Sequence, residues 1–426
     1  RARKVLVPRL YATVELRTNR HCKVALEAFS ASPKVTHHIR ILIVRPNNVE
    51  RTPQGDYLDE ELIAGLISTL AIRMPLLRSF YWDGLEMPKD ELWLTLRRFC
   101  PLLKSVGTSV GYLPIRNTNS LFDFRDLKTF ILSVKSDSLE WLLGSYYSKY
   151  LHAAVAIDYD LMTSDERPTP EKLPRRCWQM LLEHCPNLQE LKIGGSAPSP
   201  RIFDTRHVTA GRWPRLRKLT LGDMRLQPPD HDRGASPIST LDQFLIVHPR
   251  LQEVSFLQPG GDGFPSTLSL PFASLPNMTS FSGPSRYLRC LPHPENIQHL
   301  SITTLHHCLS AFPRTYALLK AMPSLLSLTL WIDLTFANRN IIQDDNNIFR
   351  NLLECCPSLL HFEVFCFTRP SFHLRDFSAA LCRSPRLRSF SLTKVYKPSD
   401  EDMSHTATRG SLMIQGALNS LGNMEY

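Results

Sequence analysis

The chain has 426 residues, of which 43% are hydrophobic and 21% charged, with 50 Lys and Arg against 40 Asp and Glu. This composition supplies enough apolar residues for a core and excludes a wholly disordered chain. The longest apolar stretches, residues 63–72 and 322–332, are shorter than the ~18 residues that a membrane-spanning helix requires. The ten cysteines are spread along the chain rather than concentrated in a small domain, which favours a reducing compartment, cytoplasmic or nuclear.

The positive charge is concentrated at the start of the chain. Residues 1–45 hold ten basic side chains against two acidic ones, so they account for +8 of the net +10. A nucleic-acid-binding protein more often carries its basic stripe on the main folded surface. The overall charge is therefore only weak evidence for a nucleic-acid partner, and none is predicted. The basic segment is a candidate contact for acidic partners.

An acidic run marks the start of a helix after this segment. It contains Asp56, Asp59, Glu60 and Glu61 and directly precedes the apolar stretch 63–72. Negative side chains in a first turn are stabilised by the helix dipole. The run is therefore interpreted as a helix start rather than as a reactive site.

From residue 75 onward, the pattern Pro-x-Leu-x-x-apolar-x-apolar recurs about every 28 residues. Clear copies begin at Pro186, Pro214, Pro249, Pro323, Pro357 and Pro385, and weaker ones begin at Pro75, Pro101 and Pro276. The apolar positions at a period of two predict a short strand with one buried face. The stretch before each proline has apolar residues at helical spacing, and proline then ends the helix.

A single unit of helix, proline and strand buries too little apolar surface to be stable alone, so the units must stack. We therefore predict an α/β solenoid with a curved parallel β-sheet on its concave side and α-helices outside. The interval between Pro101 and Pro186 has room for two further units. Their candidate strands lie at residues 124–134 and 152–161.

The repeat resembles the leucine-rich repeat in its longer helical form, although it lacks the Asn or Cys that normally follows the strand. Residues 7–16 (Val-Pro-Arg-Leu-Tyr-Ala-Thr-Val-Glu-Leu) resemble the last helix of an F-box running into a first strand. With the strand 39–44, they resemble fungal F-box proteins with leucine-rich-repeat-like tails. The residues assigned to the F-box remnant are Leu6, Pro8, Leu10 and Tyr11.

This resemblance implies a domain organisation. Residues 1–20 would be the end of an F-box and the first strand, and residues 21–426 an irregular leucine-rich-repeat-like solenoid. Most of the F-box would lie before Arg1, so no adaptor-binding residues are assigned. We also expect the array to be cut within a repeat at Tyr426, because residues 421–424 parallel the start of the repeat at 275–278.

The resemblance also implies a function. The chain would be a non-enzymatic substrate receptor of a Skp–cullin–F-box ubiquitin ligase, with a target protein on the concave face and the adaptor bound through the upstream F-box. The alternative is a leucine-rich-repeat scaffold in another intracellular complex, with no ligase role.

The predicted concave face presents mainly small polar residues. In register, the first column reads Lys192, Thr220, Ser255, Ser282, Ser301, Thr329, Glu363 and Ser391. Two positions later the column reads Gly194, Gly222, Leu257, Pro284, Thr303, Trp331, Phe365 and Thr393, and Phe367 points the same way. Trp331, Phe365 and Phe367 form a predicted aromatic patch, and exposed aromatic side chains are favoured interface anchors. The candidate partner-binding residues are these three with Glu363 and Lys192; alternatively, a neighbouring loop or the C-terminal tail covers them.

The motifs of catalysis and cofactor binding are weak. Residues 107–111 match the Gly-x-Ser-x-Gly nucleophile elbow, but Pro114 and Asn117 follow where the elbow needs a helix. A hydrolase with Ser109 as nucleophile is therefore only a third hypothesis. The sequence has no Gly-Lys-Ser/Thr phosphate loop, paired Cys-x-x-Cys or His-Glu-x-x-His motif, so no enzyme activity, cofactor or metal is predicted.

Several smaller clusters have simple structural interpretations. The histidines of 37–38 and the run 306–308 lack a spaced set of further metal ligands and are interpreted as surface or loop residues. Of the neighbouring pair 355–356, one cysteine is expected to be buried and the other to lie outside. The basic residues of 212–218 are interpreted as the solvated edge of a repeat.

Overall fold

The computed structural model describes most of the chain between residues 7 and 394. The described residues are 7–46, 59–111, 113–134, 171–194, 203–204, 206–222, 224–225, 240–257, 268–306, 312–332, 345–366, 378, 381–382, 384 and 386–394. The chain divides into an N-terminal unit, residues 1–250 with 261–265, and a C-terminal unit, residues 251–260 with 266–426.

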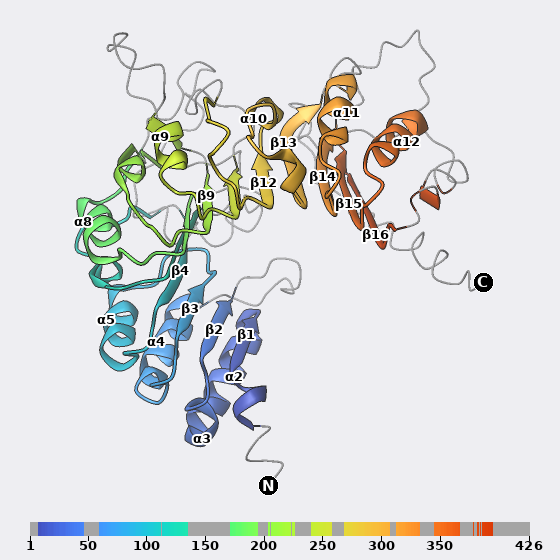
Figure 1. The fold of residues 1–426 in the computed structure, drawn as a ribbon. Coiled ribbons are helices and arrows are strands. Elements are labelled where there is room, and N and C mark those ends of the chain that lie inside the picture. Colours follow the sequence, from blue (N-terminus) through green and yellow to red (C-terminus); the bar gives the residue numbers. More distant parts are fainter. Residues whose placement is uncertain are drawn as a thin grey trace, which may run out of the picture. The chain divides into compact units, whose positions relative to one another are not determined.

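The N-terminal unit is built on a parallel sheet with the strand order β1-β2-β3-β4-β5-β7-β9 (Figure 1). These strands are β1 (Thr13–Arg17), β2 (Ile41–Arg45), β3 (Ser79–Trp82), β4 (Ser105–Val110), β5 (Thr129–Val134), β7 (Glu190–Ile193) and β9 (Lys218–Leu221). A smaller parallel sheet has the order β10-β8-β6 and consists of β6 (Glu171–Lys172), β8 (Phe203–Asp204) and β10 (Met224–Arg225). The predicted strand within residues 124–134 is confirmed by β5, whereas the one at 152–161 lies outside the described residues.

Helices cover one face of this sheet (Figure 1). They are α2 (Asn19–Ala31), α3 (Pro33–Thr36), α4 (Glu60–Ala71), α5 (Asp90–Phe99), η1 (Ser120–Asp123), α8 (Arg175–Gln179) with its π-helical continuation η3 (Met180–His184), η4 (Arg206–Ala210) and α9 (Thr240–Ile246). The acidic helix start is confirmed at α4, where the Asp59 side chain accepts a hydrogen bond from the Leu62 N–H at 2.9 Å. Asp59 is thus the N-cap residue of the helix.

The C-terminal unit repeats this arrangement with the strand order β11-β12-β13-β14-β15-β16. The strands are β11 (Glu253–Phe256), β12 (Ser280–Gly283), β13 (His299–His306), β14 (Ser327–Ile332), β15 (His361–Cys366) and β16 (Ser389–Lys394). Its helices are α10 (Ser285–Leu288), η5 (Pro294–Asn296), α11 (Phe312–Lys320) and α12 (Asp345–Cys355).

The repeated proline occupies a defined place in a turn. Before Pro357, the Cys356 carbonyl accepts a hydrogen bond from the Leu359 N–H at 3.1 Å. The same contact joins Met322 to Leu325 around Pro323. Proline therefore stands at the second position of a four-residue turn, for which its fixed φ is preorganised. The residue before proline and the leucine after it both point into the core, which explains the spacing of the repeat.

The core lies between each sheet and its helices. Alternate strand residues are buried on that side, and in the N-terminal unit one such row is continuous through paired strands. It consists of Val14, Leu42, Phe80, Val106, Phe130, Leu191 and Leu219. Parallel strands with a helical layer on one face form a leucine-rich-repeat-like α/β solenoid, so the predicted fold class is confirmed. The opposite side of each sheet, which carries the half-buried strand residues, is called the open face below.

The cysteines that precede prolines are buried as predicted, and Cys100, Cys185 and Cys356 are at most 2% exposed. The prediction for residues 355–356 is wrong in one respect, because Cys355 is also buried at 7% exposure. Helix α11 packs against α12 and brings Tyr316 close to Cys355. The second flank of the helix is therefore covered by its neighbour rather than by solvent.

Candidate functional site

The open face of the N-terminal unit carries an apolar patch. Its members are the half-buried side chains Ile41, Ile43, Tyr81 and Ile131 from strands β2, β3 and β5. Ile43 pairs in register with Tyr81, Tyr81 with Gly107, and Gly107 with Ile131. The patch therefore runs across four neighbouring strands.

Gly107 makes this patch continuous because it has no side chain. A Cβ atom at Gly107 would clash with the Tyr81 ring and come within 3.1 Å of the Ile131 Cβ. The ring of Tyr81 therefore lies over the backbone of β4. Burial raises the pKa of Tyr81, and the negative charge of Asp83 adds to the shift, so this phenol is neutral at physiological pH.

Ion pairs border the patch at the carboxyl ends of β1 and β2. Glu15 contacts Arg17 at 2.9 Å and Arg45 at 3.3 Å, and the Arg45 Nε also lies 3.7 Å from an Asp83 oxygen. The hydrogen bond from Arg17 lowers the pKa of Glu15, and the charge of Arg45 acts in the same direction. An apolar centre with a charged border is the usual anatomy of a protein-binding surface.

Lys192 lies next to this apolar patch. On β7 it pairs with Ile131 on one side and with Thr220 on the other. The predicted column of open-face residues therefore begins, at Lys192, on the strand next to the patch and does not include the patch itself. Of the missed residues, Tyr81 and Gly107 follow from extending the same register through the weaker repeats at Pro75 and Pro101. Ile41 and Ile43 lie on the strand predicted at 39–44, and Ile131 lies within the candidate strand 124–134.

The open face of the C-terminal unit is rich in hydroxyl groups and imidazoles. One row runs His299, Ser327, His361 and Ser389, and the next runs Ser301, Thr329, Glu363 and Ser391. The His361 Nδ1 lies 2.7 Å from the Ser389 Oγ, and the Thr329 hydroxyl donates to Glu363 at 3.3 Å. Glu363 therefore stands on the open face, as predicted.

The predicted neighbours Trp331 and Phe365 stack on each other in the next row of the same open face. They pair in register on β14 and β15, and their ring centroids lie 4.5 Å apart with planes inclined by 17°. Phe367 lies outside the described residues. The predicted column of open-face residues is wrong at Thr303. A bulge in β13 after Ile302 places Leu305, and not Thr303, opposite Trp331 of β14.

The Gly-x-Ser-x-Gly motif does not present a nucleophile. Ser109 lies in β4 with 0% exposure, and its Oγ donates a hydrogen bond to the Gly84 carbonyl at 2.5 Å. A nucleophile elbow needs an exposed serine between a strand and a helix. Through this hydrogen bond to Gly84, the Ser109 hydroxyl instead links β4 to the loop that follows β3.

The residues assigned to the F-box remnant are placed in part. Residues 7–10 form a helical turn in which Leu10 is 69% exposed and Pro8 is half-buried. Tyr11 packs edge-on against Phe29 of α2, with ring centroids 6.2 Å apart. Leu6 lies outside the described residues.

The described chain contains few groups suited to metal or thiol chemistry. Within the described ranges, no three His, Cys, Asp or Glu side chains are grouped so as to hold a metal ion. His37 and His38 contact each other edge-on at 5.7 Å, and residues 307–308 are not among those described. Burial raises the pKa of Cys22 and Cys100 to about 12, so both remain protonated thiols. No described helix has the length and apolar character needed to cross a bilayer.

Comparison with known proteins gives matches among solved structures only. No family model matches the sequence, and no curated protein matches it. The leucine-rich repeat-containing protein LegL7 from Legionella pneumophila is 12% identical, with a TM-score of 0.33 over 87% of this chain and 97% of LegL7. A TLR13–ssRNA13 complex is 13% identical, with a TM-score of 0.25 over 89% of this chain and 57% of that chain. The fold assignment rests on the strand register and the helical layer described above.

Proposed function

We propose that this chain is a protein-interaction module that holds a target protein on its open faces. Repeat arrays of this kind offer an extended surface for binding. The observation that carries the proposal is the apolar patch of Ile41, Ile43, Tyr81 and Ile131, bordered by the ion pairs of Glu15 and Arg45. Apolar and aromatic side chains inside a charged border supply affinity, while the border supplies selectivity.

In its more specific form, the module is the substrate receptor of a Skp–cullin–F-box ubiquitin ligase in the cytoplasm or nucleus. Residues 1–20 are then the end of an F-box and its first strand, and residues 21–426 are the array that holds the target. This form rests on the sequence resemblance of residues 7–16. The receptor has no catalytic role, because other subunits transfer ubiquitin. The competing form is a scaffold in another intracellular complex, with acidic partners bound by the basic residues of 1–45.

Target capture tests the general proposal. Ile131→Ser removes an apolar side chain from the β5 edge of the patch, whereas Ile72→Ser changes an isoleucine that is 60% exposed beyond helix α4. A target held on the open face is lost or bound at least about tenfold more weakly by the first variant. The second variant retains it. Equal capture by both folded variants would contradict the proposal.

Adaptor binding separates the two specific forms. The protein encoded by the full reading frame that contains this chain is tested for binding to a purified Skp-type adaptor, at low and at physiological salt. Stable binding that depends on residues upstream of Arg1 supports the ligase receptor. Absence of adaptor binding, with salt-sensitive capture of acidic proteins by residues 1–45, supports the scaffold.

A further inference from the structure

The helical layer of the N-terminal unit contains a pocket where a repeat lacks a full helix. Helices α4 and α5 have 12 and 10 residues, but the next element in this layer, η1, has only four. Between α5, η1 and α8 there is a pocket of about 460 Å³. Charged and polar side chains line it, namely Arg97, Asp123, Arg125, Arg176, Gln179 and His184.

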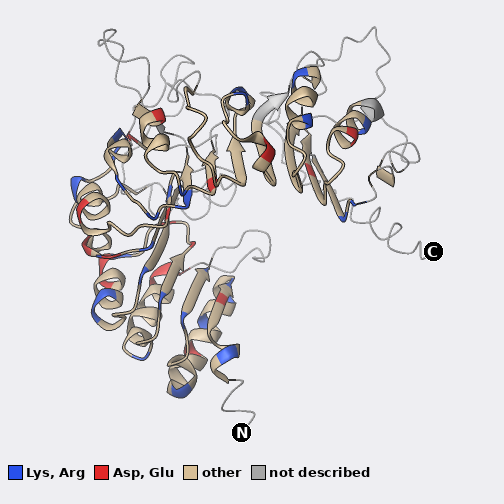
Figure 2. Cartoon of the chain, in the orientation of Figure 1, with Lys and Arg blue, Asp and Glu red and all other residues tan. Residues whose placement is uncertain are grey.

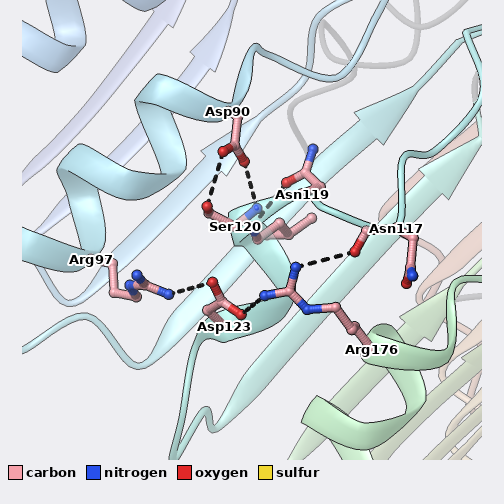
Figure 3. A network of polar contacts seen from close by, with 8 residues as sticks. Asp90, Arg97, Asn117, Asn119, Ser120, Asp123 and Arg176 are labelled. Carbon is pink, nitrogen blue, oxygen red and sulfur yellow. Dashed lines mark hydrogen bonds and ion pairs between the residues drawn. The ribbon is translucent and has the colours of Figure 1, made fainter.

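Side-chain hydrogen bonds fix the short element η1, which contributes Asp123 to the pocket lining (Figure 3). At its start, Asp90 of α5 accepts hydrogen bonds from the Ser120 N–H and from the Ser120 hydroxyl, the latter at 3.0 Å. The Asn119 side chain accepts from the Leu121 N–H at 2.9 Å. The hydrogen bonds of Ser120 to Asp90 of α5 therefore fix the position of η1.

One carboxylate orients two arginines from different helices. Asp123 contacts Arg97 of α5 at 2.7 Å through one oxygen and Arg176 of α8 through the other. Arg176 also donates to the Asn117 carbonyl at 3.2 Å (Figure 3). Both arginine side chains are more than one-third exposed. They are thus held in place while their remaining N–H groups stay available, which lowers the entropy cost of binding a ligand.

The pocket has more positive charge than its own carboxylate can balance. Among the described residues, Arg125 is exposed and has neither a hydrogen-bond partner nor an ion-pair partner. Three arginines against Asp123 leave two positive charges without a counter-charge at this pocket. Elsewhere, acidic and basic residues are mixed over the helices of the N-terminal unit (Figure 2). The surplus is therefore local and does not form a stripe that could follow a nucleic acid.

The wall opposite α5 has an unusual backbone. Residues Met180–His184 form a π-helical turn that continues α8. Such turns are rare and lie frequently at functional sites. This one carries Met180 and His184 to the pocket, after Arg176 and Gln179 from the preceding α-helical turn.

We infer that this pocket binds a phosphate monoester dianion. A phosphate monoester carries about −1.5 to −2 charges at neutral pH, which matches the two unbalanced positive charges. Its oxygens fit the planar donor fork of arginine in a two-bonded geometry. The volume falls within the ~300–1,000 Å³ of small-ligand sites and so accommodates the phosphate with its ester group. The site lies in the helical layer, so it is independent of the open faces proposed for target binding.

Calorimetric titration of the full chain tests this inference with three probes. They are inorganic phosphate, a short peptide with one phosphoserine, and the same peptide without phosphate. The phosphorylated peptide and phosphate bind, whereas the unmodified peptide does not. Tighter binding of the phosphopeptide than of phosphate supports a partner protein as the source of the phosphate. Equal binding shows that the pocket recognises the phosphate alone and favours a free phosphorylated molecule as the source.

A matched pair of variants ties the binding to the pocket. Arg125→Gln removes the unpaired guanidinium and weakens phosphate binding about tenfold or more, because a charge-assisted hydrogen bond is lost. Arg98→Gln removes one positive charge next to Arg97 in α5, from a residue that does not line the pocket. This variant changes phosphate binding less than threefold. Because Arg125 is exposed and unpaired, its variant folds, as thermal melting verifies. No binding of either phosphate probe, or equal weakening by both variants, would overturn the inference.

Discussion

The buried imidazole of His248 holds two segments of the N-terminal unit together. It is 1% exposed, its Nε2 accepts a hydrogen bond from the Trp213 N–H at 3.1 Å, and its Nδ1 lies 2.6 Å from the Phe244 carbonyl. These contacts require the neutral ring with its proton on Nδ1. Burial lowers the pKa of His248, and the nearby charge of Arg212 adds to that effect.

This histidine makes the N-terminal unit sensitive to mild acid. Its folded pKa lies below the unfolded value of about 6.5, so the unfolded chain takes up the proton first and stability falls as the pH drops below that value. We expect the Tm to decrease between pH 7 and pH 5, by roughly 2–4 °C for each 1 kcal/mol lost. Thermal melting as a function of pH measures it. The variant His248→Gln, whose side chain does not titrate, should have a lower Tm at pH 7 and a smaller decrease of Tm between pH 7 and pH 5. An unchanged dependence of Tm on pH would show that other groups cause the decrease.

At the scale of the element, the repeated turn separates the roles of proline and leucine. Pro357 is exposed and contributes mainly a fixed φ, whereas Leu359 is 1% exposed and fills the core. We expect Pro357→Ala to lower the free energy of unfolding by about 0.4–1 kcal/mol, through a more flexible unfolded chain. Leu359→Ala should lower it by about 2–5 kcal/mol, because it leaves a cavity. Urea unfolding of both variants measures the difference, and similar losses would mean that proline also packs.

The same elements show what the sequence can and cannot predict. The strands that follow the clear prolines were predictable, because Leu and two apolar positions must all face one core. The bulge in β13 was not, since Thr303 and Thr304 both suit a strand and give no sign that Leu305 takes the paired position. Nor was η1, whose position depends on Asp90 from the helix before it.

At the scale of the whole molecule, the two units share one repeat but present different open faces. The N-terminal unit exposes an apolar patch with ion pairs, and the C-terminal unit exposes hydroxyl groups, imidazoles and the Trp331–Phe365 stack. The aromatic pair was predictable, because both residues stand at the same position of adjacent clear repeats. The arginine pocket was not, since Arg97 and Arg176 lie 79 positions apart and only the stacking of repeats joins them.

The difference between the faces leads to a test of which one holds the target. If the C-terminal face contributes, Trp331→Ala with Phe365→Ala removes the stacked aromatic pair from it, because the two rings are half-buried on adjacent strands. We expect target affinity to fall about tenfold or more, as for aromatic anchors at other interfaces. Surface plasmon resonance with the captured target measures it. Phe272→Ala, at a ring that is 75% exposed in a loop of the same unit, is the matched control. Unchanged affinity of the folded double variant would remove the aromatic pair from the binding surface and leave the patch around Tyr81 as the docking site.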